Sequence, residues 1–267
     1  MVYLSPAAKV QRRLWGTDPR AWADLAESHN RPLFEALLEA TGVGAGTRLL
    51  DVGCGTGLTL VLAEERGALV SGVDVTPGLL AIARERLPAA DLHEAEMEQL
   101  PFPDRVFDVV LGVNAFQFAG DPVAALREAA RVCRVGGVVA ASLFAAPERS
   151  QSTVLHHAMA ALSPPEREAE HAPYLLSAPG NLEAALVTAG LELVGDGEVA
   201  CAWRYAGMDD AVRGLLCSAG GARAAADAGA DAVRAVLRET LAQFEDRATG
   251  RIVMHNTFRW VAGRVPR

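Results

Sequence analysis

The sequence has little of what marks several common classes of protein. Its 267 residues include one lysine, Lys9, and no apolar run long enough to cross a bilayer, since the most apolar stretch is 138–146. The four cysteines form no Cys-x-x-Cys pair and have no clustered histidine partners; they are Cys54, Cys133, Cys201 and Cys217. This spacing argues against a zinc site or a disulfide framework, so we expect no metal and reduced, mostly buried thiols.

The charge of the chain narrows the classes of partner. Acidic residues outnumber basic ones by 33 to 25, giving a formal net charge of −8. Such a chain offers no broad basic surface to neutralise a phosphate backbone, so we expect no nucleic acid partner. The first residues lack the pattern of a secretory signal, and we expect a cytoplasmic protein that does not associate with membranes.

The length and a hydrophobic content of 51% suit one core with elaborations. We divide the chain into three parts. Residues 1–42 are expected to form a helical arm, because apolar residues recur at helical spacing over 19–41. Residues 43–145 form the core, and residues 146–267 form a C-terminal half with cap helices and the last strands.

Strands and helices alternate through the core. Short apolar runs predict strands at 48–52, 69–74, 91–95, 106–113 and 138–144. Helices are predicted between them at 58–66, 77–87 and 121–134, the last two opened by Thr-Pro and Asp-Pro pairs. This order predicts an α/β fold of Rossmann-like type, with a parallel sheet covered by helices on both faces.

The regular alternation of strands and helices ends after residue 145. The pattern predicts a polar helical stretch at 149–176, a helix near 180–189 and a strand near 191–203. An alanine-rich helical region at 208–245 and a last strand at 251–264 follow. The helical segments are additions to the core, so we expect them to form the cap.

Three glycines separate the first predicted strand from its helix, at Gly53, Gly55 and Gly57. Such a turn lets the backbone approach a ligand without a Cβ clash and points helix N-terminal amides at it. The spacing is GxGxG, whereas the dinucleotide fingerprint is GxGxxG. Asp74 ends the second strand, where a carboxylate can accept both hydroxyls of a ribose. Both features converge on the crevice beyond the strand ends.

Four segments together resemble the class I S-adenosylmethionine-dependent methyltransferases: Leu49 to Gly57 (LLDVGCGTG), Gly72-Val73-Asp74, Leu100 to Asp104 (LPFPD) and Phe107 to Val110 (FDVV). Within that class the sequence is most similar to the ubiquinone and menaquinone C-methyltransferases and to natural-product enzymes. The resemblance covers about residues 43–145. It implies a seven-stranded mixed sheet whose last strand is antiparallel, and S-adenosylmethionine as the cofactor, with S-adenosylhomocysteine as its product.

The resemblance also implies which residues hold the cofactor. Those at its methionine end lie at the end of the first strand or after the first and fourth strands: Asp51, Gly53, Cys54, Gly55, Gly57, Asn114, Ala115 and Gln117. Those at its adenosine end follow the second and third strands: Asp74, Val75, Glu96, Met97 and Glu98. In this assignment Asp51 helps to hold the ammonium, directly or through water, Asp74 holds the ribose hydroxyls and Glu96 accepts from the adenine amino group. Glu94 and Glu98 flank Glu96, so a register shifted by two residues stays open.

The acceptor is expected to be a small organic molecule, apolar or aromatic and of natural-product type, bound by a monomer or homodimer. The cap supplies apolar or aromatic lining candidates: Tyr174, Leu175, Trp203 and Tyr205. An oxygen or carbon acceptor needs a base, for which histidine is suited. The candidates are His156 and His157, then His29, with His171 and His255 weaker.

Two other readings compete with methyl transfer. A nicotinamide dehydrogenase is disfavoured by the glycine spacing and by Leu100-Pro101-Phe102. A cyclase or a binding protein that uses bound S-adenosylmethionine without transferring its methyl group stays open, because a fold does not dictate chemistry.

Overall fold

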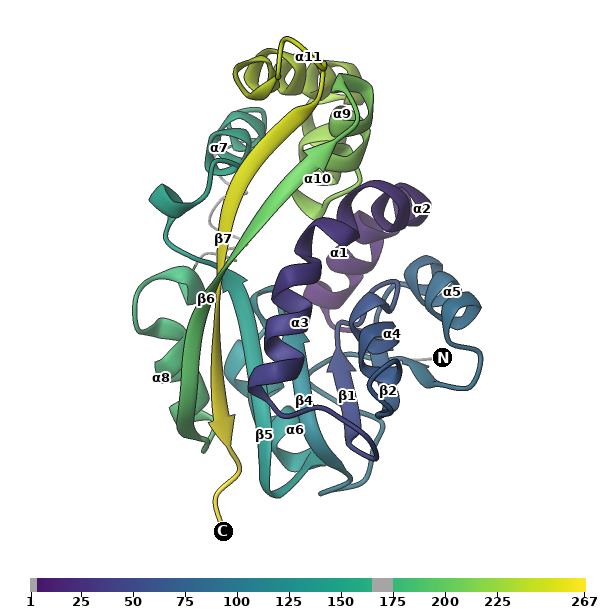
Figure 1. Ribbon diagram of the computed structural model, residues 1–267, viewed down its shortest axis with the longest axis vertical. Coiled ribbons are helices and arrows are strands. Elements are labelled where there is room, and N and C mark those ends of the chain that lie inside the picture. The colour runs from purple at the N-terminus through teal and green to yellow at the C-terminus, as the bar shows by residue number, and fades with distance from the viewer. Residues whose placement is uncertain (1–3, 165–174) are drawn as a thin grey trace.

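The computed structural model describes residues 4–164 and 175–267. A seven-stranded sheet runs through it in the order β3-β2-β1-β4-β5-β7-β6 (Figure 1). Its strands are β1 (Arg48–Val52), β2 (Leu69–Asp74), β3 (Asp91–Glu94), β4 (Phe107–Val113), β5 (Cys133–Phe144), β6 (Glu192–Tyr205) and β7 (Ile252–Arg264). The strands from β1 to β5 pair in parallel, whereas β7 is antiparallel to both neighbours. The predicted Rossmann-like α/β fold with a mixed sheet is confirmed.

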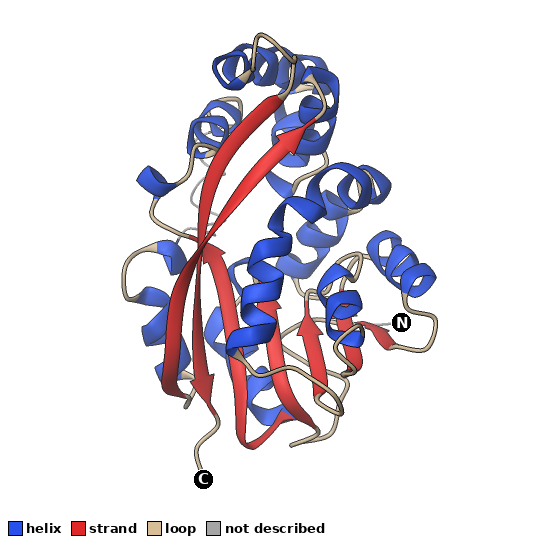
Figure 2. Ribbon diagram, viewed as in Figure 1, coloured by secondary structure: helices blue, strands red, loops and turns tan. Residues whose placement is uncertain are grey.

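Helices cover both faces of the sheet (Figure 2). One face packs against α3 (Arg31–Ala40), α4 (Leu58–Glu64) and α5 (Pro77–Arg86), and the other against α6 (Pro122–Val132) and α8 (Asn181–Thr188). Each interface is a separate apolar core. With both faces covered, the carboxyl ends of the parallel strands are the part of the sheet where loops can shape a ligand site.

The last two strands carry the cap. β6 and β7 are the two longest strands, and they continue past the sheet into a group of helices (Figure 1). The cap helices are α7 (Thr153–Ala160), α9 (Met208–Leu216), α10 (Ala219–Ala228) and α11 (Ala230–Leu241). Their apolar faces share one core with Tyr205, Ile252 and Met254 of the two strands. The antiparallel pair of β6 and β7 therefore fixes the cap to the sheet.

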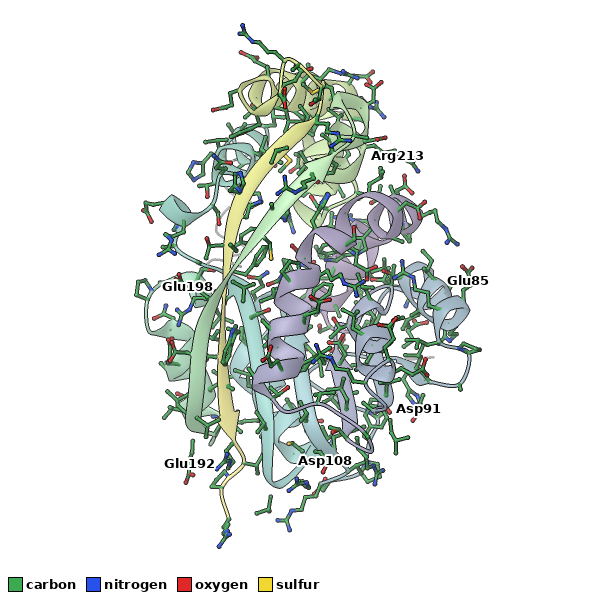
Figure 3. The ribbon with its side chains drawn as sticks, viewed as in Figure 1. Glu85, Asp91, Asp108, Glu192, Glu198 and Arg213 are labelled. Carbon is green, nitrogen blue, oxygen red and sulfur yellow. The ribbon has the colours of Figure 1, made fainter. Side chains whose placement is uncertain are left out.

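The N-terminal arm lies between the cap and the sheet. It consists of α1 (Pro6–Trp15), α2 (Pro19–Ala21), a π-helical turn (Trp22–Ala26) and a 3-10 turn (Glu27–Asn30), which lead into α3. Apolar residues of α1 pack on α10. Asp18 pairs with Arg213 of α9, at 3.4 Å, and Figure 3 labels Arg213 on the cap side. Arg20 pairs with Glu85 of α5, at 3.0 Å. The arm thus contacts both parts of the molecule.

Some predicted boundaries differ from the structure. The helical spacing found in the sequence covers 19–41 and does not include α1, whose buried stripe contains the polar Gln11. Of the polar stretch 149–176, α7 covers 153–160, and His171 and Tyr174 lie outside the described residues. β5 begins before its two glycines, because Cys133 pairs with Phe107 ahead of a register shift. Within the described ranges no helix has the length and apolar character needed to cross a membrane.

Candidate functional site

The glycine turn joins β1 to α4 at the carboxyl edge of the sheet. Its glycines have left-handed φ values: +75° at Gly53, +55° at Gly55 and +84° at Gly57. The amide of Gly53 donates to the Val73 carbonyl at 2.8 Å, which fixes the turn to β2. A Cβ at Gly53 would lie 2.7 Å from that of Ala115, whereas nothing lies within 4 Å of one at Gly55. The turn is therefore packed at Gly53 and open at Gly55.

Asp74 is bound to this turn. Its Oδ2 accepts the amide N–H of Gly55 at 2.9 Å, and its Oδ1 accepts that of Thr76 at 2.8 Å. The side chain is buried, and burial raises its pKa while the two amide hydrogen bonds oppose that rise. Val75 follows, half-buried. The carboxylate that the sequence assigns to the ribose thus also orients the amide of Gly55.

Asp51 is the most buried carboxylate of the set, with 2% of its surface exposed. Its Oδ1 has no hydrogen-bond partner among the described residues. Burial, and then the charge of Asp74, raises the pKa of Asp51 to about 7, although a hydrogen bond with Thr59 opposes this. Burial also raises the pKa of the adjacent Cys54 thiol. An unpartnered, buried acceptor fits a cationic donor such as a ligand ammonium.

The three glutamates after β3 have different environments. Glu96 is buried and accepts the backbone N–H of Ser5 in the arm. Glu94 pairs instead with Arg12 of α1. Glu98 accepts the amides of the loop before α6, from Gly120 at 2.7 Å. Among the three, Glu96 is the buried carboxylate, consistent with the predicted register, whereas Met97 is half-buried against the α6-side core.

The loop after β4 lies against the glycine turn. Asn114 adopts a left-handed φ of +54°. Its amide donates to the Ser142 carbonyl at 3.1 Å, and its Oδ1 accepts from the Ser142 hydroxyl at 3.3 Å. Ala115 is buried against Gly53, and Gln117 Nε2 donates to the Asn114 carbonyl at 3.4 Å. The structure therefore brings this predicted segment together with the turn.

The candidate histidines lie in different environments. His29 Nε2 lies 3.0 Å from the Arg204 carbonyl, and burial lowers its pKa. His156 contacts Phe144 at the end of β5, with ring centroids 5.3 Å apart, and burial lowers its pKa to about 4. His157 is exposed. Of these, His156 lies at the carboxyl edge of the sheet.

Two residues of the site had no signal in the sequence. Glu27 of the arm and Arg86 of α5 form a pair at 2.6 Å, and both contact the segment that contains Gly57. Their separation of 59 positions gives no local pattern. Of the predicted lining residues, Trp203 donates to Asn30 Oδ1 at 3.2 Å, and Tyr205 lies in the cap core. The side chain of Leu175 is outside the described part of the chain.

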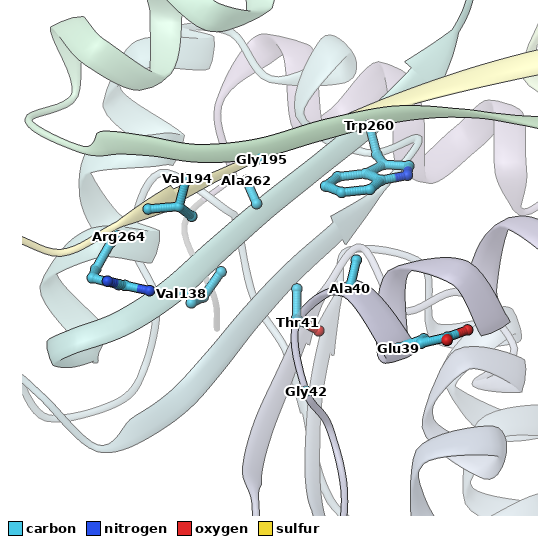
Figure 4. Close-up of a pocket in the computed structure, with 10 residues that line it drawn as sticks. All are labelled: Glu39, Ala40, Thr41, Gly42, Val138, Val194, Gly195, Trp260, Ala262 and Arg264. Carbon is cyan, nitrogen blue, oxygen red and sulfur yellow. The ribbon is translucent and has the colours of Figure 1, made fainter.

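A cavity of about 460 Å³ lies elsewhere (Figure 4). It is lined by residues at the amino end of β5, the C-terminal end of α3 and the hairpin, including Val138, Thr41, Trp260 and Arg264. This is the edge of the sheet opposite to the glycine turn. None of the predicted site residues lines it. Among the described residues, no cluster of His, Cys, Asp and Glu is arranged to hold a metal ion.

The strand order is that of a Rossmann-like fold, in which ligands bind beyond the carboxyl ends of the parallel strands, where the candidate site lies. Residues 50–141 match the family model described as methyltransferase domain. A stretch of 123 residues, 46% of this chain and 48% of the relative, is 39% identical to malonyl-[acyl-carrier protein] O-methyltransferase of Serratia marcescens. Residues 50–141 are therefore similar to the methyltransferase domain of the class I S-adenosylmethionine-dependent methyltransferases. The match spans about half the length of its curated relatives.

Solved structures show the same fold. The [4+2]-cyclase SpnF superposes with a TM-score of 0.61 and 20% identity, over 100% of this chain and 98% of that one. Phosphoethanolamine N-methyltransferase 2 of Haemonchus contortus superposes with a TM-score of 0.60 and 17% identity, over 99% of this chain and 61% of that one. That structure was solved in complex with phosphomonomethylethanolamine and S-adenosylhomocysteine. The likeness therefore extends beyond the matched domain to the arm and cap.

Proposed function

We propose that this protein transfers the methyl group of S-adenosylmethionine to a small organic acceptor with an apolar or aromatic body. The observation that carries the proposal is the joint geometry of the glycine turn, Asp74 and Asp51. The open backbone at Gly55 leaves space for a ligand, Asp74 lies where a ribose is bound in such folds, and Asp51 has an unsatisfied oxygen. These residues fit the cofactor.

The residues at the site bind and orient rather than react. When bound, S-adenosylmethionine supplies an electrophilic methyl group on a sulfonium. The carboxylates of Asp51, Asp74 and Glu96 provide a negative environment for this cation. Aligning the acceptor with the carbon–sulfur bond supplies roughly 7–11 kcal/mol of the barrier reduction in well-oriented reactions.

Aromatic side chains support the acceptor class. Phe144, at the end of β5, lies 5.3 Å from His156 and 6.0 Å from Trp203 between ring centroids. Ser142, two positions earlier on the same strand face, is hydrogen-bonded to Asn114 at the methionine end. The aromatic cluster thus adjoins the place where the methyl group is expected. Where the acceptor carries a proton, we assign its removal to His156.

Two buried polar atoms near His156 lack partners. The Ser152 amide donates to Asn256 Oδ1 at 2.9 Å. Asn256 Nδ2 and Ser152 Oγ have no hydrogen-bond partner among the described residues, although both side chains are almost wholly buried. A buried donor left unsatisfied costs about 1–3 kcal/mol. We therefore propose that the acceptor carries an oxygen that accepts from Asn256.

Matched aromatic probes test this acceptor class. With S-adenosylhomocysteine present, 2-naphthol is expected to bind about tenfold more tightly than naphthalene, because it keeps one hydrogen bond. Isothermal titration calorimetry measures both affinities. Asn256→Ala should remove the difference. Equal affinities in the native protein would contradict the assignment of Asn256.

Methyl transfer itself is tested with labelled cofactor. Calorimetry with S-adenosylhomocysteine first establishes binding, and transfer of a labelled methyl group to product then establishes the activity. Binding of S-adenosylhomocysteine without transfer of the labelled methyl group favours the alternative, a cyclase or binding protein on the same fold. Tighter binding of NADH than of the sulfonium cofactor would support the dehydrogenase reading instead.

Two glycine substitutions isolate the open position of the turn. Gly55→Ala and Gly42→Ala each place a methyl group at a left-handed φ, +55° and +69°, with no atom within 4 Å. Both should lose about 1 kcal/mol of stability from backbone strain. Only Gly55→Ala is expected to weaken binding of S-adenosylhomocysteine, by about tenfold, because its Cβ occupies ligand space. Equal affinities of the two variants would place the ligand elsewhere.

A further inference from the structure

A buried carboxylate of the N-terminal arm reaches the glycine turn. Glu27 is 4% exposed, and its Oε2 lies 2.6 Å from Arg86 Nη1 at the end of α5. Its Oε1 accepts the amide N–H of Leu58, the first residue of α4, at 3.3 Å. The arm is thus attached to the start of the helix that follows the turn.

Arg86 extends this attachment into the turn. The same Nη1 donates to the carbonyl of Thr56 at 2.9 Å and to its hydroxyl at 3.2 Å. Thr56 is fully buried. Glu27 and Arg86 therefore fix the backbone on both sides of Gly57. Loss of Arg86 leaves Glu27 as an uncompensated buried charge, whereas loss of Glu27 leaves Arg86 with 28% of its side chain exposed to solvent.

The arm also reaches the other end of the site. The backbone N–H of Ser5 donates to Glu96, the carboxylate assigned to the adenine. Pro19 packs against α5, where a Cβ at Gly78 would lie 2.8 Å from its ring. The arm therefore contacts the adenine end through Ser5 and the methionine end through Glu27.

We propose that Glu27, through its pair with Arg86, is a positioning residue that couples packing of the arm to cofactor binding. The inference rests on the proposed function. Glu27 and Arg86 act on the backbone of the turn, and the turn holds the methionine end of the cofactor. Because coupling between two events is reciprocal, an arm that favours binding is itself held in place by the bound cofactor.

Charge-removing variants test the coupling in the full-length protein. The set is Glu27→Gln, Arg86→Gln and the double variant. Arg20→Gln and Glu85→Gln serve as the matched control, since this pair also joins the arm to α5, but both side chains are more than half exposed. Figure 3 labels Glu85 at the outer side of α5. Two readouts are taken: the affinity for S-adenosylhomocysteine by calorimetry, and hydrogen exchange of arm amides with and without that ligand.

Glu27→Gln is expected to bind S-adenosylhomocysteine about tenfold more weakly. Its arm amides should exchange faster than in the native protein, and the ligand should restore less of their protection. The control variants should bind within about twofold of the native protein, because exposed pairs contribute little. The double variant removes both charges of the pair, so it should recover thermal stability relative to Arg86→Gln, which leaves the buried Glu27 unpaired, without recovering affinity.

Two outcomes would overturn the coupling. One is a Glu27→Gln or double variant that binds the ligand with native affinity, whatever its melting temperature, since Glu27 is then purely structural. The other is native ligand-induced protection of the arm in the double variant. A native protein that does not bind S-adenosylhomocysteine would instead overturn the proposed function, and the coupling with it.

Discussion

Replacing Asp74 with alanine is expected to weaken binding of S-adenosylhomocysteine by about 100-fold or more. The carboxylate is assigned to two ribose hydroxyls, and hydrogen bonds to a charged group contribute about 1.5–3 kcal/mol each. The substitution also removes the acceptor that holds the amides of Gly55 and Thr76. Ligand contact and orientation of the turn are lost together. Isothermal titration calorimetry measures the change.

An intermediate variant and a control variant test this interpretation of Asp74. Asp74→Asn keeps the shape but provides only one acceptor oxygen, so its affinity should lie between those of the native protein and Asp74→Ala. Asp108→Ala is the matched control. Asp108 lies at the amino end of β4 and is labelled in Figure 3. It accepts the Arg48 amide N–H at 2.8 Å and pairs with Arg134. Its loss should lower the melting temperature and leave binding unchanged. Native affinity in Asp74→Ala would remove the ribose assignment.

The proximity of the candidate cofactor residues could be predicted because the information for it is local. A strand, a glycine turn and a carboxylate one β-α-β unit later occupy fixed places in sequence, and the parallel pairing of β1 with β2 brings Asp51 and Asp74 to the same edge. Among the glutamates the local signal was weaker. Burial, which the sequence does not contain, distinguishes Glu96 from Glu94 and Glu98.

The arm and the acceptor side could not be predicted in the same way. Glu27 meets Arg86 across 59 positions, and Asn256 meets Ser152 across 104, so tertiary packing creates both contacts. The adjacent positions of His156 and His157 in the sequence likewise do not show which way each side chain points. On α7, neighbouring residues point about 100° apart, so His156 faces Phe144 while His157 is exposed.

Binding of S-adenosylhomocysteine is also expected to depend strongly on pH through Asp51. Burial, and then the charge of Asp74, raises the pKa of Asp51 to about 7 in the free protein. The ligand ammonium requires the charged carboxylate, so a proton must leave on binding below that value. Affinity should therefore fall by about tenfold per unit at low pH, in total about 50-fold from pH 7 to pH 5. Calorimetry at a series of pH values measures it.

Asp51→Asn separates this effect from other titrations. The variant should bind more weakly at pH 7 but lose most of the slope, whereas Asp108→Asn should keep it, because hydrogen bonds hold the pKa of Asp108 below its ordinary value despite partial burial. In the protein without ligand, the raised pKa of Asp51 makes folding stability change with pH in the opposite direction. The protonated Asp51 stabilises the fold fully below the ordinary pKa near 3.8, and this contribution is lost as the pH rises through about 7. Unliganded Asp51→Asn should accordingly melt at a higher temperature than the native protein at pH 8, and a lower melting temperature would mean that Asp51 is paired within the free protein.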